Sequence, residues 1–194
     1  LIAVNIFSIE NNNLVAYKSD LIKGIEYILK DQNFGDTEIA AVNMSLGGGT
    51  YYSYCDDDNP VLTDAFANLR SENIAPVVAS GNAGKKEAVS LPACISKATA
   101  VGATDEGSKI ADFSNLNPDM VELLAPGVEI RSAIYSSTSN DSFAKKSGTS
   151  MAAPHISGSF ALLRSSFDEL NSVSEIVHAL TTTGKRFSGS GGAN

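Results

Sequence analysis

Apolar runs of strand length alternate along the chain with segments in which apolar residues recur at helical spacing. Strands are expected at 1–7, 39–45, 74–79 and 97–103, and shorter ones at 120–124 and 129–134. Helices are expected after capping residues at Ser19, Asn59 and Ser174, and over 149–166. This alternation is typical of parallel βαβ units and predicts an α/β fold.

Two of these elements carry finer expectations. The helix that begins after Asn59 has one apolar face that is expected to point inward: Val61, Leu62, Ala65, Phe66 and Leu69. In the strand 74–79, Pro76 is expected near the entry, because proline cannot donate a ladder hydrogen bond.

Composition and charge narrow the class of protein. The chain has 194 residues, 43% hydrophobic and 19% charged, which suits one globular domain, and its formal net charge is -8. This negative charge argues against nucleic acid and anionic membranes as partners. No apolar run approaches the roughly 18 residues of a membrane-spanning helix. The chain starts at Leu1, without methionine and already inside an apolar run, so a further segment is expected upstream.

Candidate chemistry centres on 148–158, where a serine follows a glycine-threonine turn and precedes small residues that suit a helix. A hydroxyl at Ser150 would lie where unpaired backbone N–H groups and the helix dipole can stabilise an oxyanion. Pro154 lacks the N–H that would bond to the Ser150 carbonyl, so the first turn of this helix is expected to be irregular.

A serine nucleophile needs a base, and neither of the two histidines has a suitable position. On a helix, His155 lies about 7.5 Å of rise beyond Ser150 and on another face, which favours a packed structural histidine. His178, in the helix expected after Ser174, is expected to be a partly exposed helix residue.

Two further turn motifs, 43–48 and 79–84, follow predicted strands. The ligand crevice of a parallel sheet lies at the carboxyl ends of its strands, so these motifs and the Ser150 turn are expected to meet there. In this order, with 91–92, 100–103, 112–115 and 124–127 between them, they make the chain resemble the subtilisin-like serine proteases from Leu1 to about Thr183. The resemblance implies a three-layer, mostly parallel sheet with helices on both faces, its N-terminal part missing.

The resemblance also implies a role for each motif. Ser150 would be the nucleophile that attacks a polypeptide substrate, and the Asn82 side-chain amide would form the oxyanion hole with the Ser150 N–H. Two segments would bind the substrate, one as an exposed strand and one as the other wall of the pocket: Ser45, Leu46 and Gly47, then Ala79, Ser80 and Gly81. Neither wall carries an acid, which argues against a dedicated lysine or arginine pocket. No cofactor is required.

In that family the catalytic triad runs Asp, His, Ser along the chain, so both partners of Ser150 are expected upstream of Leu1. Residues 1–194 would then be the C-terminal portion of one peptidase domain, with the missing N-terminal segment as their partner. Because the residues of such a triad act as a unit, these residues alone are expected to show no meaningful proteolysis.

The two cysteines, Cys55 and Cys94, lie in expected surface loops and are interpreted either as a disulfide or as two free thiols. The disulfide is preferred, since the family is commonly secreted, and it implies an extracellular or other oxidising compartment. The acidic run 56–58 either binds a structural calcium ion, as members of the family often do, or favours the N-terminus of the helix at Pro60. The second interpretation is preferred, and no metal ligands are assigned.

Two other functions stay open. An α/β-hydrolase places its acid and base after the serine, and Asp168 and His178 do follow Ser150, but they leave no room for the intervening strands. A pseudoprotease, used as a peptide-binding or interaction module, would keep the pocket strands and lack the base even in the full-length protein. Ser150 and Asn82 favour the enzyme, because a binding module does not need an oxyanion donor.

Overall fold

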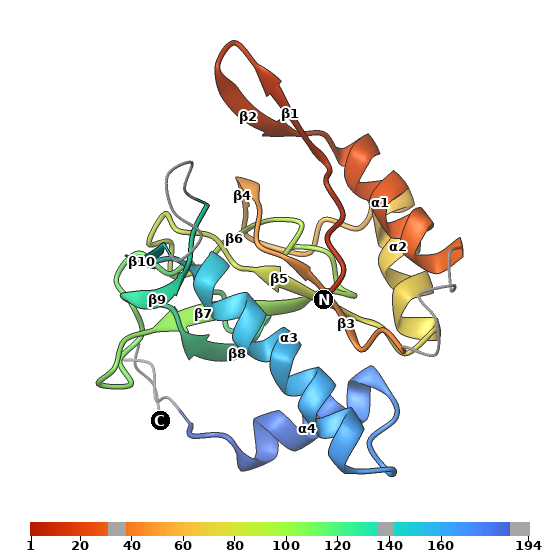
Figure 1. Ribbon diagram of the computed structural model, residues 1–194, viewed down its shortest axis with the longest axis vertical. Coiled ribbons are helices and arrows are strands. Elements are labelled where there is room, and N and C mark those ends of the chain that lie inside the picture. The colour runs from red at the N-terminus through yellow and green to blue at the C-terminus, as the bar shows by residue number, and fades with distance from the viewer. Residues whose placement is uncertain (31–37, 136–141, 187–194) are drawn as a thin grey trace.

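The computed structural model describes residues 1–30, 38–135 and 142–186. At its centre lies a four-stranded parallel sheet with the strand order β3-β5-β7-β8. Its strands are β3 (Ala41–Met44), β5 (Ala75–Ala79), β7 (Thr99–Thr104) and β8 (Val121–Pro126). The helices of the described residues are α1 (Lys18–Lys30), α2 (Pro60–Ser71), α3 (Thr149–Ser166) and α4 (Val173–Thr183). Figure 1 shows how they surround the sheet.

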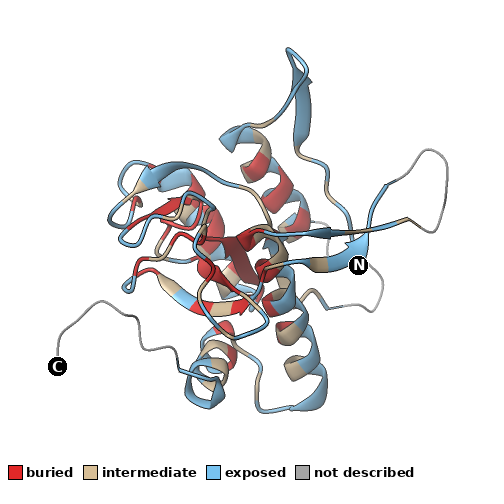
Figure 2. Cartoon of the chain, turned by 90° about the vertical axis from the view of Figure 1, so that its left-hand side faces the viewer, coloured by how far each residue is buried: buried red, intermediate tan, exposed pale blue. Residues whose placement is uncertain are grey.

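The sheet separates two hydrophobic cores, and β5 shows how. All five of its residues are buried, and successive side chains of a strand point to opposite faces. Val78 belongs to the core that α1 and α2 cover, whereas Val77 and Ala79 belong to the core that α3 and α4 cover. Buried residues accordingly gather in the sheet and on the inner sides of the helices (Figure 2). The predicted three-layer α/β fold with helices on both faces is confirmed.

In the described part of the chain, three short antiparallel pairs surround the central sheet. They are β1 (Phe7–Glu10) with β2 (Asn13–Ala16), β4 (Gly48–Tyr51) with β6 (Val89–Leu91), and β9 (Ile130–Ala133) with β10 (Phe143–Lys146). The hairpin β1–β2 projects from the body of the molecule and is largely exposed (Figures 1 and 2). Of these strands, the sequence predicted only β9.

The start of the chain differs from the expectation. Residues 1–6 have no regular secondary structure, and β1 begins only at Phe7, so the strand expected at 1–7 is wrong. Val4 and Ile6 nevertheless pack against the core beside α1, which explains the apolar alternation without strand pairing. Helix α1 begins at Lys18, so Ser19 lies inside its first turn and is not its cap.

Three other details of the elements can be compared with the prediction. Helix α4 is capped by Ser172 and not by Ser174, because Ser172 forms a capping box with Glu175. In α2, Val61 is 61% exposed and the expectation of an inward position is wrong, whereas the other four predicted positions are buried. Pro76 is the second residue of β5, ahead of the first pair with β7, so its expected place near the entry is confirmed.

Candidate active site

Three turns meet at the carboxyl ends of β3 and β5. Ser45 follows β3, Gly81 lies just beyond β5, and Thr149 and Ser150 open α3. The Ser150 hydroxyl donates to the Ser45 carbonyl at 3.3 Å, and the Gly81 N–H donates to Thr149 Oγ1 at 3.2 Å. The fold therefore brings together segments that lie 105 and 68 residues apart in the sequence.

The helix start that carries Ser150 is closely packed. Gly148 is the N-cap of α3 and is buried, and its carbonyl accepts the Met151 N–H at 2.9 Å. A side chain at Gly148 would bring a Cβ atom to 3.3 Å from Asn82 Nδ2, which is closer than most Cβ contacts. Glycine at this position thus lets the Asn82 amide approach the serine turn. Ser150 itself is half-buried.

Thr149 orients the Asn82 amide. Asn82 Oδ1 accepts from the Thr149 N–H at 2.8 Å and from the Thr149 hydroxyl at 2.9 Å. Because both donors bind the amide oxygen, they define which end of the amide is the NH2 group. That group then lies beside Gly148, at the turn that leads into Ser150. The sequence patterns assigned Thr149 no role. Its position between Gly148 and Ser150 was the only feature of the sequence that could have indicated one.

Asn115 holds the loop that carries Asn82. This side chain is fully buried, and its Oδ1 accepts from the N–H groups of Ala83 and Lys85 at 3.0 and 3.1 Å. Its Nδ2 donates to the Ser80 carbonyl at 3.3 Å. Gly81 has a φ of +112°, and a Cβ atom there would lie 2.4 Å from Asn115 Nδ2, so only glycine fits. The sequence patterns placed 112–115 in the resemblance without a role for Asn115.

The residues predicted to bind substrate have different degrees of exposure. Gly47 is exposed, whereas Ser45 and Leu46 are half-buried, and this segment connects β3 to β4. Ala79 and Ser80 are 3% and 0% exposed, and the Ser80 hydroxyl donates to the Asn115 carbonyl at 2.8 Å. Of the two segments, 45–47 is therefore the more accessible to a ligand, whereas Ala79 and Ser80 are enclosed by the protein.

Neither histidine approaches Ser150 as a base would. His155 is exposed, and its Nδ1 lies 2.8 Å from the Met151 carbonyl within α3. The expectation of a packed residue is wrong, because His155 faces away from the sheet. His178 lies on α4 and is exposed, more fully than the partial exposure that was expected. A base for Ser150 is not found among the histidines of these residues.

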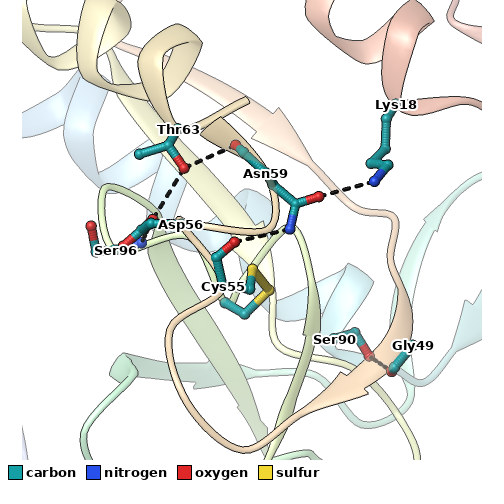
Figure 3. Close-up of a disulfide and its surroundings, with 9 residues drawn as sticks. Lys18, Gly49, Cys55, Asp56, Asn59, Thr63, Ser90 and Ser96 are labelled. Atoms are coloured by element: carbon teal, nitrogen blue, oxygen red, sulfur yellow. Dashed lines mark hydrogen bonds between the residues drawn. A yellow bond between two sulfur atoms is a disulfide. The ribbon is translucent and has the colours of Figure 1, made fainter. Parts of the chain in front are cut away.

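The predicted disulfide is present: Cys55 and Cys94 are joined at an S–S distance of 2.06 Å (Figure 3). Both side chains are buried. The loop around Cys55 lies at the surface as expected, whereas residues 92–95 around Cys94 are buried and that expectation is wrong. The Cys55 N–H donates to the Cys94 carbonyl at 2.9 Å and draws the two loops together. Asp56 Oδ1 accepts from Thr63 Oγ1 at 3.1 Å and from the Ser96 N–H at 3.0 Å. In the described part of the chain, no three His, Cys, Asp or Glu side chains are grouped as a metal site requires.

Comparison with known proteins identifies the family. The sequence profile of the subtilase family, peptidase S8, matches residues 2–193. The major intracellular serine protease of Bacillus subtilis (strain 168) is 34% identical over 168 residues, 82% of this chain and 47% of that protein. Alkaline protease 1 of Emericella nidulans is 34% identical over 179 residues, 91% of this chain and 40% of that protein. The chain spans about half the length of these relatives, or less.

Solved structures have the same fold. A cold adapted subtilisin-like serine proteinase matches with a TM-score of 0.68 and 25% identity, over 90% of this chain and 57% of that chain. The prenylagaramide maturation protease PagA matches with a TM-score of 0.74 and 26% identity, over 94% of this chain and 62% of that chain. Since the family profile extends over nearly all of the sequence, the chain belongs to the subtilase family, the subtilisin-like serine proteases.

Proposed function

We propose that the polypeptide to which this chain belongs is a serine endopeptidase, with Ser150 as its nucleophile and Asn82 as its oxyanion donor. The observation that supports this most directly is the pair of hydrogen bonds from Thr149 to Asn82 Oδ1. They hold the amide NH2 beside the Ser150 turn before any substrate arrives, so no ordering of the donor is needed during the reaction. The family, and the name of one relative, the major intracellular serine protease of Bacillus subtilis, support the same reaction.

The reaction would form and break one acyl bond in two steps. Ser150 Oγ attacks the scissile carbonyl carbon while its proton passes to a base, and the negative oxygen is held by Asn82 Nδ2 and the Ser150 N–H. The intermediate collapses to an acyl-serine as the amine leaves with a proton from that base. Water then releases the acid by the same route in reverse. Segment 45–47 would pair with the peptide backbone as an added strand.

The base and its orienting acid would come from a segment outside these residues. Both histidines of the sequence are exposed, and neither forms a hydrogen bond with Ser150; His155 Nδ1 lies 2.8 Å from the Met151 carbonyl. The chain spans about half the length of the first relative. We therefore infer that the aspartate and histidine of the triad belong to an N-terminal segment of the same domain. This segment would be the partner of the chain, and residues 1–194 alone would be inactive.

The disulfide and the names of the relatives bear on the compartment in which the protein works. Cys55 and Cys94 form a buried bridge, which favours an oxidising environment. Two relatives are named extracellular proteases, of Bacillus subtilis and Dichelobacter nodosus, whereas another is named intracellular. No helix in the described residues is long and apolar enough to cross a membrane. We propose secretion on the strength of the disulfide. The described residues contain no group of three or more His, Cys, Asp or Glu side chains that could hold a metal ion, so we assign no ligands to a structural calcium ion.

An active-site probe tests the assignment. The full polypeptide is treated with a serine-reactive fluorophosphonate, and the labelled residue is mapped by mass spectrometry. Labelling is expected at Ser150, is expected to vanish in Ser150→Ala, and is expected to persist in Ser165→Ala, a matched change on the exposed end of α3. Absence of labelling in the full polypeptide would indicate a pseudoprotease. Equal labelling of residues 1–194 alone would refute the need for an outside base.

A further inference from the structure

The helix that carries the nucleophile lacks one of its own hydrogen bonds. In an α-helix the carbonyl of each residue accepts the N–H of the residue four positions later. Four residues after Ser150 stands Pro154, inside α3, and proline has no N–H. The Ser150 carbonyl therefore has no regular helical partner, although α3 continues unbroken from Thr149 to Ser166.

A hydroxyl from another element takes the place of that N–H. Ser45, directly after β3, donates from its side chain to the Ser150 carbonyl at 2.8 Å. The two residues are 105 positions apart, so the contact depends on the folded chain. Ser150 is half-buried. A carbonyl oxygen in such a place that lacks a hydrogen bond destabilises the folded state.

Asn43 sets the direction of the Ser45 hydroxyl. Asn43 Nδ2 donates to Ser45 Oγ at 2.9 Å, and Asn43 Oδ1 lies 3.5 Å from the hydroxyl of Ser157 on α3. A hydroxyl that accepts from an amide has its single hydrogen left for another acceptor. The Ser45 hydrogen is thus directed to the Ser150 carbonyl.

We propose that the Ser45 side chain is a positioning residue for the nucleophile: its hydroxyl replaces the helical N–H that Pro154 lacks and so fixes the peptide plane that follows Ser150. This inference rests on the proposed function of Ser150. It adds a side-chain role to a residue whose backbone was expected to bind substrate. The direction of Ser150 Oγ depends on the backbone angles of its own residue, which the fixed carbonyl restricts.

The same pair of residues is linked a second time. Ser150 Oγ donates to the Ser45 carbonyl at 3.3 Å, while Ser45 Oγ donates to the Ser150 carbonyl. The hydrogen bond from Ser150 Oγ must break when the Ser150 proton moves to a base. The hydrogen bond from Ser45 Oγ to the Ser150 carbonyl is retained during the reaction. The nucleophile would therefore be released from the substrate-binding segment without its backbone moving.

A double-mutant cycle on the full polypeptide tests the proposal. Ser45→Ala is expected to lower kcat about tenfold with less than about a twofold change in KM, because the half-buried Ser150 carbonyl loses its hydroxyl partner. Pro154→Ala restores an N–H at the helical position. In that background the same Ser45→Ala change is expected to lower kcat by about twofold or less. Equal losses of kcat in the two backgrounds would overturn the proposal.

Two further variants separate positioning from simple loss of structure. Ser45→Thr keeps the hydroxyl and is expected to keep most of kcat, whereas Ser159→Ala removes a hydroxyl that donates within α3, to the His155 carbonyl, and should leave kcat unchanged. The thermal midpoints of the four proteins in the cycle give a second readout that needs no proteolysis. If the polypeptide does not hydrolyse peptides, the proposed function fails. The thermal midpoints then decide the positioning role by themselves. Coupling between Ser45 and Pro154 in stability would support that role, and the absence of coupling would overturn it.

Discussion

At the scale of single residues, the proposed oxyanion donor is the side-chain amide of Asn82. Asn82→Ala removes the proposed donor and also the acceptor of the buried Thr149 N–H, and kcat is expected to fall about 10²- to 10³-fold with little change in KM, as it does on removal of an oxyanion donor in subtilisin. Steady-state kinetics of the full polypeptide on a peptide substrate measure it.

Thr149→Val supplies the matched comparison for Asn82→Ala. It removes the hydroxyl that binds Asn82 Oδ1 but keeps the backbone N–H at 2.8 Å, so the amide stays oriented by one donor. The loss of kcat is expected to be about tenfold or less. A larger loss for Thr149→Val than for Asn82→Ala, or a loss seen only in KM, would contradict the assigned geometry.

Sequence patterns predicted the candidate catalytic residues but not the residues that hold them in place. Ser150 and Asn82 stand in turns with distinctive glycines, and a turn motif is local enough to be seen in sequence. Thr149 and Asn115 act through hydrogen bonds to residues 67 and 32 positions away. A polar side chain that bonds across such a separation has no periodic signal, so only the structure reveals its partner.

At the scale of elements, the cap of helix α4 lies two residues before the serine that the sequence predicted, at Ser172 instead of Ser174. Its N-terminus is fixed by Ser172, whose hydroxyl accepts from the Glu175 N–H at 3.2 Å. The Glu175 carboxylate accepts from the Ser172 N–H at 2.9 Å in return. These bonds from Ser172 hold the pKa of Glu175 below its ordinary value of 4.5.

The capping box leads to a prediction for stability and its pH dependence. Ser172→Ala is expected to lower the free energy of unfolding by about 1 kcal/mol at neutral pH. A carboxyl whose folded pKa is depressed stabilises above its unfolded pKa and loses that effect as pH falls through the folded pKa. The destabilisation caused by Glu175→Gln should therefore be largest at neutral pH and shrink below the ordinary value of 4.5.

Denaturant unfolding at several pH values measures both effects in the full polypeptide. Ser174→Ala is the matched control, since Ser174 is exposed in the first turn and does not cap the helix. Its effect is expected to stay within about 0.5 kcal/mol. A loss for Ser174→Ala that equals the loss for Ser172→Ala would show that the cap is misassigned.

The strands divide by how fully they are buried. β5 and β7 are buried along their whole length, and the sequence predicted both from continuous apolar runs. The strands of the pairs β1–β2 and β4–β6 are three or four residues long, and at least one strand of each pair is largely exposed. Their sequences therefore show neither a continuous apolar run nor a strict alternation of apolar and polar residues. Short paired strands of this kind depend on their partner more than on their own sequence.

At the scale of the whole molecule, the disulfide joins two loops that pack against the same hydrophobic core. Cys55 lies ahead of α2 and Cys94 after β6, and both belong to the core that α1 and α2 cover. The bridge spans 39 residues, a stretch that includes α2, β5 and the Asn82 loop. A bridge that closes a loop of this length stabilises the protein mainly because it lowers the conformational entropy of the unfolded chain.

Removing the bridge should therefore weaken the fold while leaving the native arrangement intact. Replacing both cysteines, Cys55→Ala with Cys94→Ala, is expected to lower the free energy of unfolding by about 4 kcal/mol, from the loop-closure entropy of a bridge of this span. Denaturant unfolding with and without a reductant measures the loss. Because the cysteines are 3% and 0% exposed, the native protein should resist reduction until it unfolds. The double variant should not respond to reductant, and a wild-type midpoint that stays fixed under reducing conditions would show that the bridge contributes nothing to stability.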